Sequence, residues 1–446
     1  MLKNHWARVG QVKRAGVLVP LFSIYSKDSI GIGDFLDLNP LVDWCAGTYN
    51  SILQLLPMNE FGPTSCPYDA ISSFALEPAY ISLCDLSCGR HKDVAKSIKE
   101  LRAQFPPGKA HVDYRIKDAK IELLRRVYIL SQKDLDSKDF RKFESENSYW
   151  LNDFALFKVL KSRNGGKPWY EWAQAYRDRD EKSLRSFEKA NKEGITFEKW
   201  VQWVAFTQFA RAKKRAASKG VFIKGDLPIL ISRDSADVWS HPDFFNLGFA
   251  AGAPPDMYCA KGQRWGMPTY DWDKIASDGY RYVKEKLKFA GNFYDILRID
   301  HVVGLFRIWS IPYDDPMENE GSNGVFDPKD ETLWAEHGRR LLSIILGATD
   351  MLLCAEDLGM IPKACPEALR EMAIPGNEVE RWVKDWSGTH DFLGPEKYRQ
   401  LAVSMLSTHD TTNWAAWWEN EAGTVDEALF LKKCAERDID YEKVKK

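Results

Sequence analysis

The segment "YDILRIDH", from Tyr294 to His301, places charged side chains at the end of a short apolar run. Apolar runs of this length that end in polar or turn residues are typical of buried parallel strands. Side chains alternate along a strand, so Arg298 and Asp300 are expected to lie on the same side of it. A charge buried without a partner costs free energy, so this pair needs either a structural reason or a chemical one.

Other apolar runs have the same form. They span residues 15–21, 51–58, 220–230, 350–359 and 402–410. The last three carry Asp226, Glu356 and the pair His409–Asp410, each near the end of its run. Helical patterns separate several of the runs, as in residues 280–291 and 331–346. Strands that alternate with helices predict an α/β fold with a parallel sheet.

The position of the polar residues favours one architecture within that class. They fall at the carboxyl ends of the runs, which is where a (β/α)₈ TIM barrel builds its active site. An open doubly wound sheet also binds ligands at its strand ends, but "GIGDFL" (31–36) lacks the third glycine of a dinucleotide-binding loop. We therefore predict a barrel from residues 1–75 and 220–446, interrupted by a mainly helical subdomain over residues 76–219.

Composition excludes several classes of function. The 446 residues are 44% hydrophobic and 28% charged with a net charge of −2, which predicts neither nucleic-acid nor membrane partners. The eight cysteines lack zinc-ligand spacing, and no segment has the form of a signal peptide or a membrane span. A reducing, cytoplasmic location is expected. The 17 tryptophans fit either a packed core or a surface that binds sugar rings.

The acidic residues suggest a reaction class. Asp300, Glu356 and Asp410 end three predicted strands, and two carboxylates that flank a bond are what glycosidic chemistry requires. Taken singly, Asp300 also fits a buried ion pair, Glu356 a strand-end turn or helix cap, and "STHD" (407–410) a polar loop. Their shared position at matching strand ends favours a common site.

At this point the sequence resembles a known family, the 4-α-glucanotransferases of the amylomaltase, or disproportionating enzyme, group (glycoside hydrolase family 77). The matching segments occur in the family's order over nearly the whole chain. They are "GIGDF" (31–35), "LQLLPMN" (53–59), "CPYDAISSFALEPAYISL" (66–83), "KGDLPILISRDSADVWSHPDFF" (224–245), "AGAPPDMYCAKGQRWGMPTYDWD" (251–273), "RIDHVVGL" (298–305), "AEDLG" (355–359), "IPG" (374–376) and "STHD" (407–410).

The resemblance implies a (β/α)₈ barrel with inserted subdomains, α-1,4-glucans and maltooligosaccharides as donor and acceptor, and no cofactor or metal. It implies Asp300 as nucleophile, Glu356 as general acid/base and Asp410 as transition-state stabiliser. Substrate contacts are implied for Tyr68, Asp226, Arg298, His301 and His409. A covering loop over residues 251–273 would add Asp256, Gln263 and Trp265.

Three physical expectations accompany these roles. Arg298 should lower the pKa of Asp300, and burial near a carboxylate should keep Glu356 protonated. A covering loop that excludes water should favour transfer to a sugar over hydrolysis. An α-glucan hydrolase with the same three acids and a non-catalytic glucan-binding relative remain alternatives, whereas a metal-dependent phosphohydrolase at His409–Asp410 would need further ligands.

The sequence departs from the family in two places. Val302 and Val303 replace an aromatic residue and an arginine of the usual bacterial pattern, so we expect different contacts on the acceptor side. The family also continues past "STHD" with a last strand and helices, whereas this sequence ends at Lys446. We therefore expect a barrel without its last β/α unit. The oligomeric state is not determined by the sequence.

Overall fold

The computed structural model describes residues 5–86, 91–256, 259–385, 388–389, 391–420 and 427–440. The chain forms two compact units, Met1–Ala368 and Leu369–Lys446, and each is described by itself. Among the residues described, no helix has both the length and the apolar character needed to cross a membrane.

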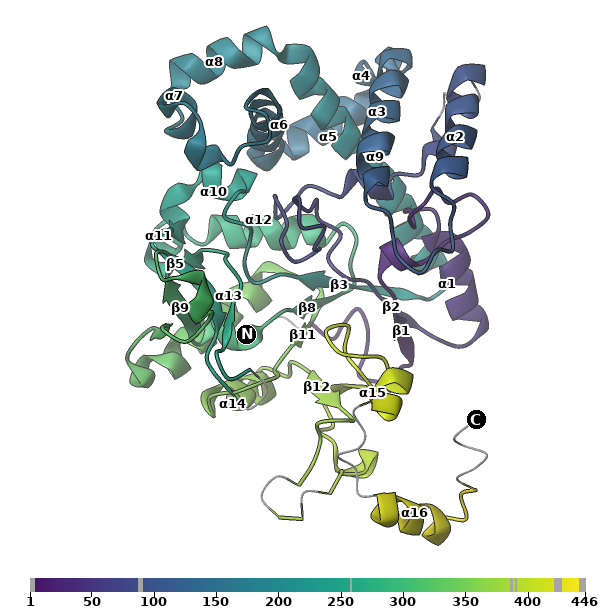
Figure 1. The fold of residues 1–446 in the computed structure, drawn as a ribbon, viewed down its shortest axis with the longest axis vertical. Helices are drawn as coiled ribbons and strands as arrows, with labels where there is room; N and C mark the ends of the chain where they lie inside the picture. Colours follow the sequence, from purple (N-terminus) through teal and green to yellow (C-terminus); the bar gives the residue numbers. More distant parts are fainter. Residues whose placement is uncertain are drawn as a thin grey trace. The chain divides into compact units, whose positions relative to one another are not determined.

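The centre of the first unit is a parallel sheet of five strands (Figure 1). Its strands, in spatial order, are β1 (Gly16–Leu18), β2 (Ile52–Gln54), β3 (Phe222–Leu227), β8 (Ile296–Ile299) and β11 (Leu352–Ala355). Strands β8 and β11 are buried along their whole length, as expected for parallel strands covered on both faces. The α/β class predicted from the sequence is confirmed.

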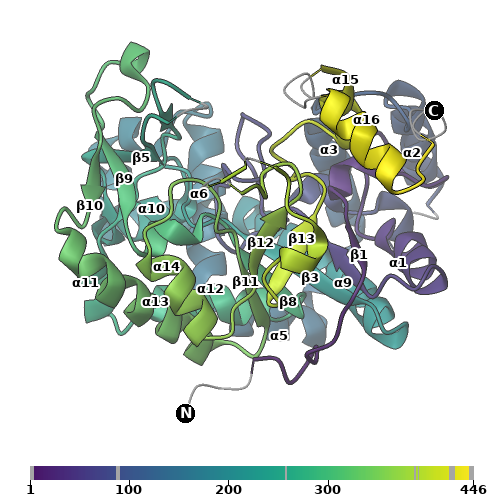
Figure 2. The same cartoon turned by 90° about the horizontal axis from the view of Figure 1, so that it is seen from below.

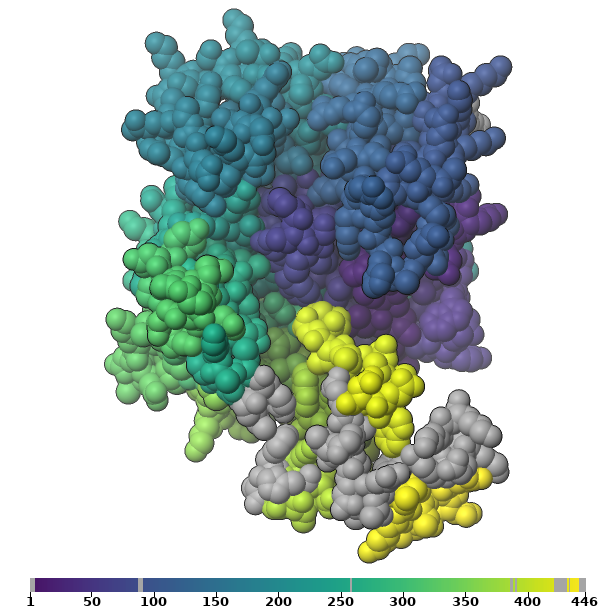
Figure 3. Space-filling view, in the orientation of Figure 1, coloured from purple at the N-terminus to yellow at the C-terminus, as the bar shows by residue number. Residues whose placement is uncertain are grey.

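A long helical segment separates β2 from β3. Its helices are α2 (Lys92–Gln104), α3 (Arg115–Leu130), α4 (Gln132–Leu135), α5 (Lys138–Glu146), α6 (Ser148–Arg163), α7 (Gln174–Arg177), α8 (Glu181–Ala190) and α9 (Lys192–Ser218). Figure 3 shows this segment as a continuous body of blue atoms at the top of the view. Aromatic packing ties it to the sheet, because Phe209 of α9 stacks on Phe293, just before β8, with ring centroids 4.4 Å apart.

The remaining helices of the first unit lie around the sheet. They are α1 (Leu38–Gly47), α10 (Ala236–Ser240), α11 (Trp272–Ser277), α12 (Arg281–Ala290) and α13 (Trp334–Ala348). Helices α12 and α13, which precede and follow β8 in the chain, pack against each other beside the strands (Figure 2). Most large aromatic side chains serve this core: Trp200 and Trp239 are fully buried, whereas Trp44 and Trp414 are exposed.

A second, antiparallel sheet stands beside the first in the same unit. Its spatial order is β10 (Val325–Asp327), β9 (Ile308–Pro312), β5 (Phe249–Ala253) and β6 (Gln263–Arg264), and the short strands β4 (Phe245–Asn246) and β7 (Thr269–Tyr270) form a separate pair. The segment 251–273, expected as a covering loop, thus contains the end of β5, the short strands β6 and β7, and the start of helix α11.

The second unit contains a parallel pair of strands, β12 (Gly376–Val379) and β13 (Ala402–Met405), and the helices α15 (Trp414–Asn420) and α16 (Glu427–Glu436). Helix α14 (Ala364–Glu371) contains the boundary between the units. Strand β13 occupies the apolar run that precedes "STHD", as the sequence predicted.

Candidate active site

Strand register brings polar residues together at one edge of the parallel sheet. Asp226 of β3 and Arg298 of β8 are direct partners across the ladder. Asp300 and Glu356 each follow the last residue of a strand, and their backbone N–H groups continue the ladder by donating to Leu227 O (3.2 Å) and Ile299 O (2.9 Å). Carboxyl ends of parallel strands meet at the same edge, so the expected clustering of these side chains follows from the sheet itself.

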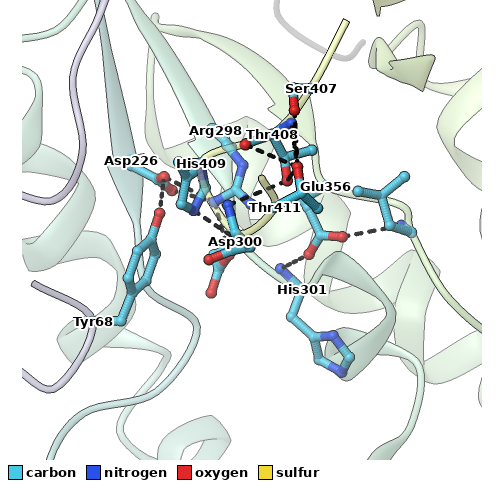
Figure 4. A network of polar contacts seen from close by, with 12 residues as sticks. Tyr68, Asp226, Arg298, Asp300, His301, Glu356, Ser407, Thr408, His409 and Thr411 are labelled. Atoms are coloured by element: carbon cyan, nitrogen blue, oxygen red, sulfur yellow. Dashed lines mark hydrogen bonds and ion pairs between the residues drawn. The ribbon is translucent and has the colours of Figure 1, made fainter. Parts of the chain in front are cut away.

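Arg298 is the hub of the first part of the site. Its side chain is 6% exposed, and Nη1 donates to both carboxylate oxygens of Asp226 (2.8 Å each) and to Oδ1 of Asp300 (2.7 Å). The Tyr68 hydroxyl, from the loop after β2, donates to Oδ2 of Asp226 at 2.7 Å (Figure 4). One buried cation therefore orients two carboxylates, and a tyrosine from a distant segment closes the network.

Glu356 is held by the backbone rather than by a cation. Its Oε2 accepts the N–H of His301 at 2.7 Å, and its Oε1 accepts the N–H of Leu358 at 3.1 Å (Figure 4). His301 adopts a left-handed conformation with φ 44°, which is uncommon for a residue with a side chain. The N–H that Glu356 Oε2 accepts thus belongs to a residue with an uncommon backbone conformation, and strain of this kind is often found at functional sites.

Burial dominates the electrostatics of the two acids. Burial raises the pKa of Asp300 to about 7, with further upward contributions from Asp226 and Glu356 and an opposing one from Arg298. Arg298 does lower the pKa of Asp300, as expected, but one guanidinium shared by two carboxylates does not offset their desolvation, so the net pKa is raised. The pKa of Glu356 is also raised, chiefly by burial, as expected.

His301 is kept neutral in this environment. Burial, followed by the charges of Arg307 and Arg298, lowers the pKa of its imidazole to about 4. The His301 ring meets Trp265 edge to face, with centroids 4.9 Å apart. Trp265 in turn donates through Nε1 to Oε1 of Gln263 at 2.9 Å. Two of the three residues predicted on the covering segment are thus linked to the strand-end cluster.

The third of these residues, Asp256, is hydrogen-bonded to Cys259. Its Oδ1 accepts the N–H of Cys259 at 2.7 Å, and its own N–H donates to Cys259 O at 3.0 Å. Val302 and Val303, the two positions that depart from the usual family pattern, begin a 3₁₀ turn with side chains buried in the core. Their apolar character is explained by that burial.

The residues His409 and Asp410 belong to the second unit. They lie on a loop after β13, and His409 Nε2 is 3.0 Å from Oδ2 of Asp410, whose side chain is 69% exposed. Arg381 holds this loop: it donates to the Ser407 hydroxyl (2.7 Å), the Thr412 carbonyl (2.7 Å) and the Thr412 hydroxyl (3.1 Å).

Sequence reasoning did not identify Arg381. It lies two residues past the end of strand β12, which has the sequence "GNEV" and gives no apolar run to draw attention to it. Within the described part of the chain, no group of three or more His, Cys, Asp or Glu side chains is placed to hold a metal ion.

Comparison with known proteins shows the family to which this chain belongs. The family model described as 4-alpha-glucanotransferase, glycosyl hydrolase family 77, matches residues 19–445. A 4-alpha-glucanotransferase of Chlamydia caviae is 38% identical over 422 residues, which cover 94% of this chain and 78% of the relative. One from Thermus thermophilus is 32% identical over 393 residues, which cover 85% and 74% of the two chains.

A solved structure agrees with these matches. The amylomaltase of Streptococcus agalactiae, determined in complex with acarbose, superposes with a TM-score of 0.79 and 26% identity, covering 92% of this chain and 82% of that one. The resemblance noted in the sequence is confirmed. The chain belongs to the 4-alpha-glucanotransferase family, glycoside hydrolase family 77.

Proposed function

We propose that this 4-alpha-glucanotransferase moves α-1,4-glucan segments between maltooligosaccharides by a retaining double displacement, with Asp300 as nucleophile and Glu356 as general acid/base. The observation that carries this proposal is the pair of partly buried carboxylates that follow the adjacent parallel strands β8 and β11. Arg298 holds one oxygen of Asp300, whereas two backbone N–H groups hold Glu356. The two acids therefore have different environments, which suits two different roles.

In the first step, an ionised oxygen of Asp300 attacks the anomeric carbon of the donor as the bond from that carbon to the leaving glucan breaks. Glu356 gives its proton to the leaving oxygen, and a glycosyl ester on Asp300 results. In the second step, Glu356 takes the proton of the acceptor's 4-hydroxyl. The acceptor oxygen bonds to the anomeric carbon, and the ester bond to Asp300 breaks. Two inversions leave the anomeric configuration unchanged.

Further residues support this reaction in the proposal. Asp410, on the exposed loop of the second unit, would bind sugar hydroxyls more tightly as the ring flattens toward an oxocarbenium ion. The substrate contacts proposed are Tyr68, Asp226, Arg298, His301 and His409, with Asp256, Gln263 and Trp265 on the covering segment. Residues 76–219 are proposed as a helical insertion between two barrel strands, in keeping with the position of α2–α9 between β2 and β3.

The test is incubation with pure maltotriose, followed by separation of the products by size and measurement of reducing ends. We expect glucose together with a ladder of longer maltooligosaccharides and little gain in reducing ends, and no product from the Asp300→Asn control. A gain of reducing ends without any product longer than maltotriose would identify an α-glucan hydrolase instead. Binding of maltotriose without any product from the unaltered chain would identify a non-catalytic glucan-binding protein.

A further inference from the structure

Within the covering segment (residues 251–273), neighbouring side chains at strand β6 point to opposite sides. Neighbouring residues of a strand point to opposite sides, so Gln263 and Trp265 share one side and Arg264 takes the other. Gln263 and Trp265 are hydrogen-bonded to each other, and Trp265 meets His301 beside the two acids. Arg264 is therefore directed away from the site while its two neighbours belong to it.

Arg264 binds a loop that follows strand β9, which we call the brace (residues 313–324). Its Nη1 donates to Asp315 O at 2.6 Å, and its Nη2 donates to Tyr313 O at 2.6 Å. A third, longer contact joins Nη2 to Pro312 O at 3.5 Å. Charged donors make the stronger class of hydrogen bond, and a guanidinium is suited to hold two carbonyls at once because its donors form a rigid fork.

Other contacts between the covering segment and the brace are weaker or use the backbone. Gly321 N donates to Lys261 O at 2.9 Å, and the Lys261 ammonium donates to Glu318 O at 3.1 Å. The two backbones approach so closely that a Cβ on Gly321 would lie 2.5 Å from Gln263 N and 2.7 Å from Ala253 O. The brace thus packs closely against the segment that carries the site residues. Two charged side chains join them, and Arg264 makes the two shorter contacts, 2.6 Å each against 3.1 Å for Lys261.

The brace is itself anchored in the fold. It begins where β9 ends, and β9 lies between β5 and β10 in the antiparallel sheet. The indole of Trp309, in β9, also donates to Gly321 O at 2.8 Å. The covering segment already supplies β6 and part of β5 to this sheet, and Arg264 adds a side-chain link from β6 to the loop after β9.

We propose that Arg264 is a positioning residue that keeps the covering segment closed over the glycosyl-enzyme and thereby sets the ratio of transfer to hydrolysis. This inference rests on the function proposed above. In the second step the ester bond to Asp300 breaks as the anomeric carbon bonds to an acceptor oxygen, whose proton passes to Glu356. That oxygen belongs either to a sugar 4-hydroxyl or to water, and a covering segment that opens more often admits water more often.

The experiment compares Arg264→Met, Arg264→Lys and the unaltered chain with maltotriose as sole substrate. Longer products measure transfer, and new reducing ends measure hydrolysis. Loss of the charged hydrogen bonds in Arg264→Met should lower the transfer-to-hydrolysis ratio about tenfold. Arg264→Lys keeps the charge but lacks the forked donors of a guanidinium. Its transfer-to-hydrolysis ratio should therefore lie between those of Arg264→Met and the unaltered chain. The matched control is Arg102→Met. It removes a hydrogen bond from Arg102, on helix α2, to the carbonyl of Asp28, away from the covering segment.

A second variant tests the contact between the covering segment and the brace by a change on the brace. Gly321→Ala adds a methyl group that the closed arrangement cannot accommodate, and its ratio should fall as well, even if Arg264→Met does not fold. A total rate that falls in Arg264→Met and Gly321→Ala at an unchanged ratio would overturn the inference, since a purely structural role has that effect. An equal fall in Arg102→Met would overturn it too. Failure of the unaltered chain to form longer products would instead refute the proposed function.

Discussion

Replacing Glu356 by glutamine removes a proton donor while keeping the shape of the side chain. The carboxylate accepts two backbone N–H groups, from His301 and Leu358, whereas glutamine has one oxygen. One N–H must therefore face the new NH₂ group, which costs about 1–3 kcal/mol for an unsatisfied buried donor. The folded state of Glu356→Gln should be measurably less stable for this reason alone.

The catalytic effect should be much larger than the structural one. General acid/base catalysis contributes about 10²–10⁴-fold, and a glucan is a poor leaving group without protonation, so turnover of maltotriose should fall by at least that order. An α-glucosyl fluoride needs far less protonation to leave. With this donor Glu356→Gln should still glycosylate Asp300, and the intermediate should persist because no base remains to activate an acceptor.

The assay is mass spectrometry of the intact protein after reaction with the fluoride, followed by peptide mapping. We expect an added glycosyl mass on a peptide that contains Asp300, and none in Asp300→Asn. The fluoride also separates the two effects, since a distorted site would not be rescued by a better leaving group. Turnover of maltotriose at the unaltered rate would remove Glu356 from its role, and an adduct on another carboxylate would remove Asp300.

Three further outcomes are expected. Tyr68→Phe removes the hydroxyl that donates to Asp226 and should lower the free energy of unfolding by about 1–2 kcal/mol in a urea titration; an unchanged midpoint would contradict this. In the proposed mechanism Asp300 must be ionised to attack, and its pKa is raised to about 7, so kcat/KM should increase as pH rises from 5 to 8; a flat profile would argue against Asp300 as the nucleophile. Arg381→Met removes the hydrogen bonds that hold residues 407–412, so their amide hydrogens should exchange faster than in the unaltered chain; equal protection would show that Arg381 does not order this loop.

Much of the first unit could be predicted because buried parallel strands have a simple sequence form. The run that ends in "RIDH" became β8, and the run before "AEDLG" became β11, each with its acid one residue past the strand. Amphipathic patterns were equally informative: the helix expected over 280–291 is α12, Arg281–Ala290.

Other features depend on interactions that a single sequence does not display. Strand β6 is two residues long, and its pairing with β5 depends on the tight approach of Gly252 to Gln263 O. The role of Arg264 depends on which backbone carbonyls meet it, which no residue pattern records. The raised pKa of Asp300 is a further example, since it reflects burial and the sharing of Arg298 with Asp226.

The left-handed residue His301 has a consequence for how this site can vary. Its amide nitrogen belongs to the peptide unit that follows Asp300, and the same nitrogen donates to Glu356. One covalent link and one hydrogen bond therefore bridge the two acids, and the bridge is made of main-chain atoms. Side chains that we propose contact the sugar, such as Gln263 and Trp265, can then be exchanged to change which glucans are accepted while the proposed stereochemical course is preserved. Selectivity and stereochemistry are separable properties in this scaffold, and variation in the covering segment is a means to alter the first alone.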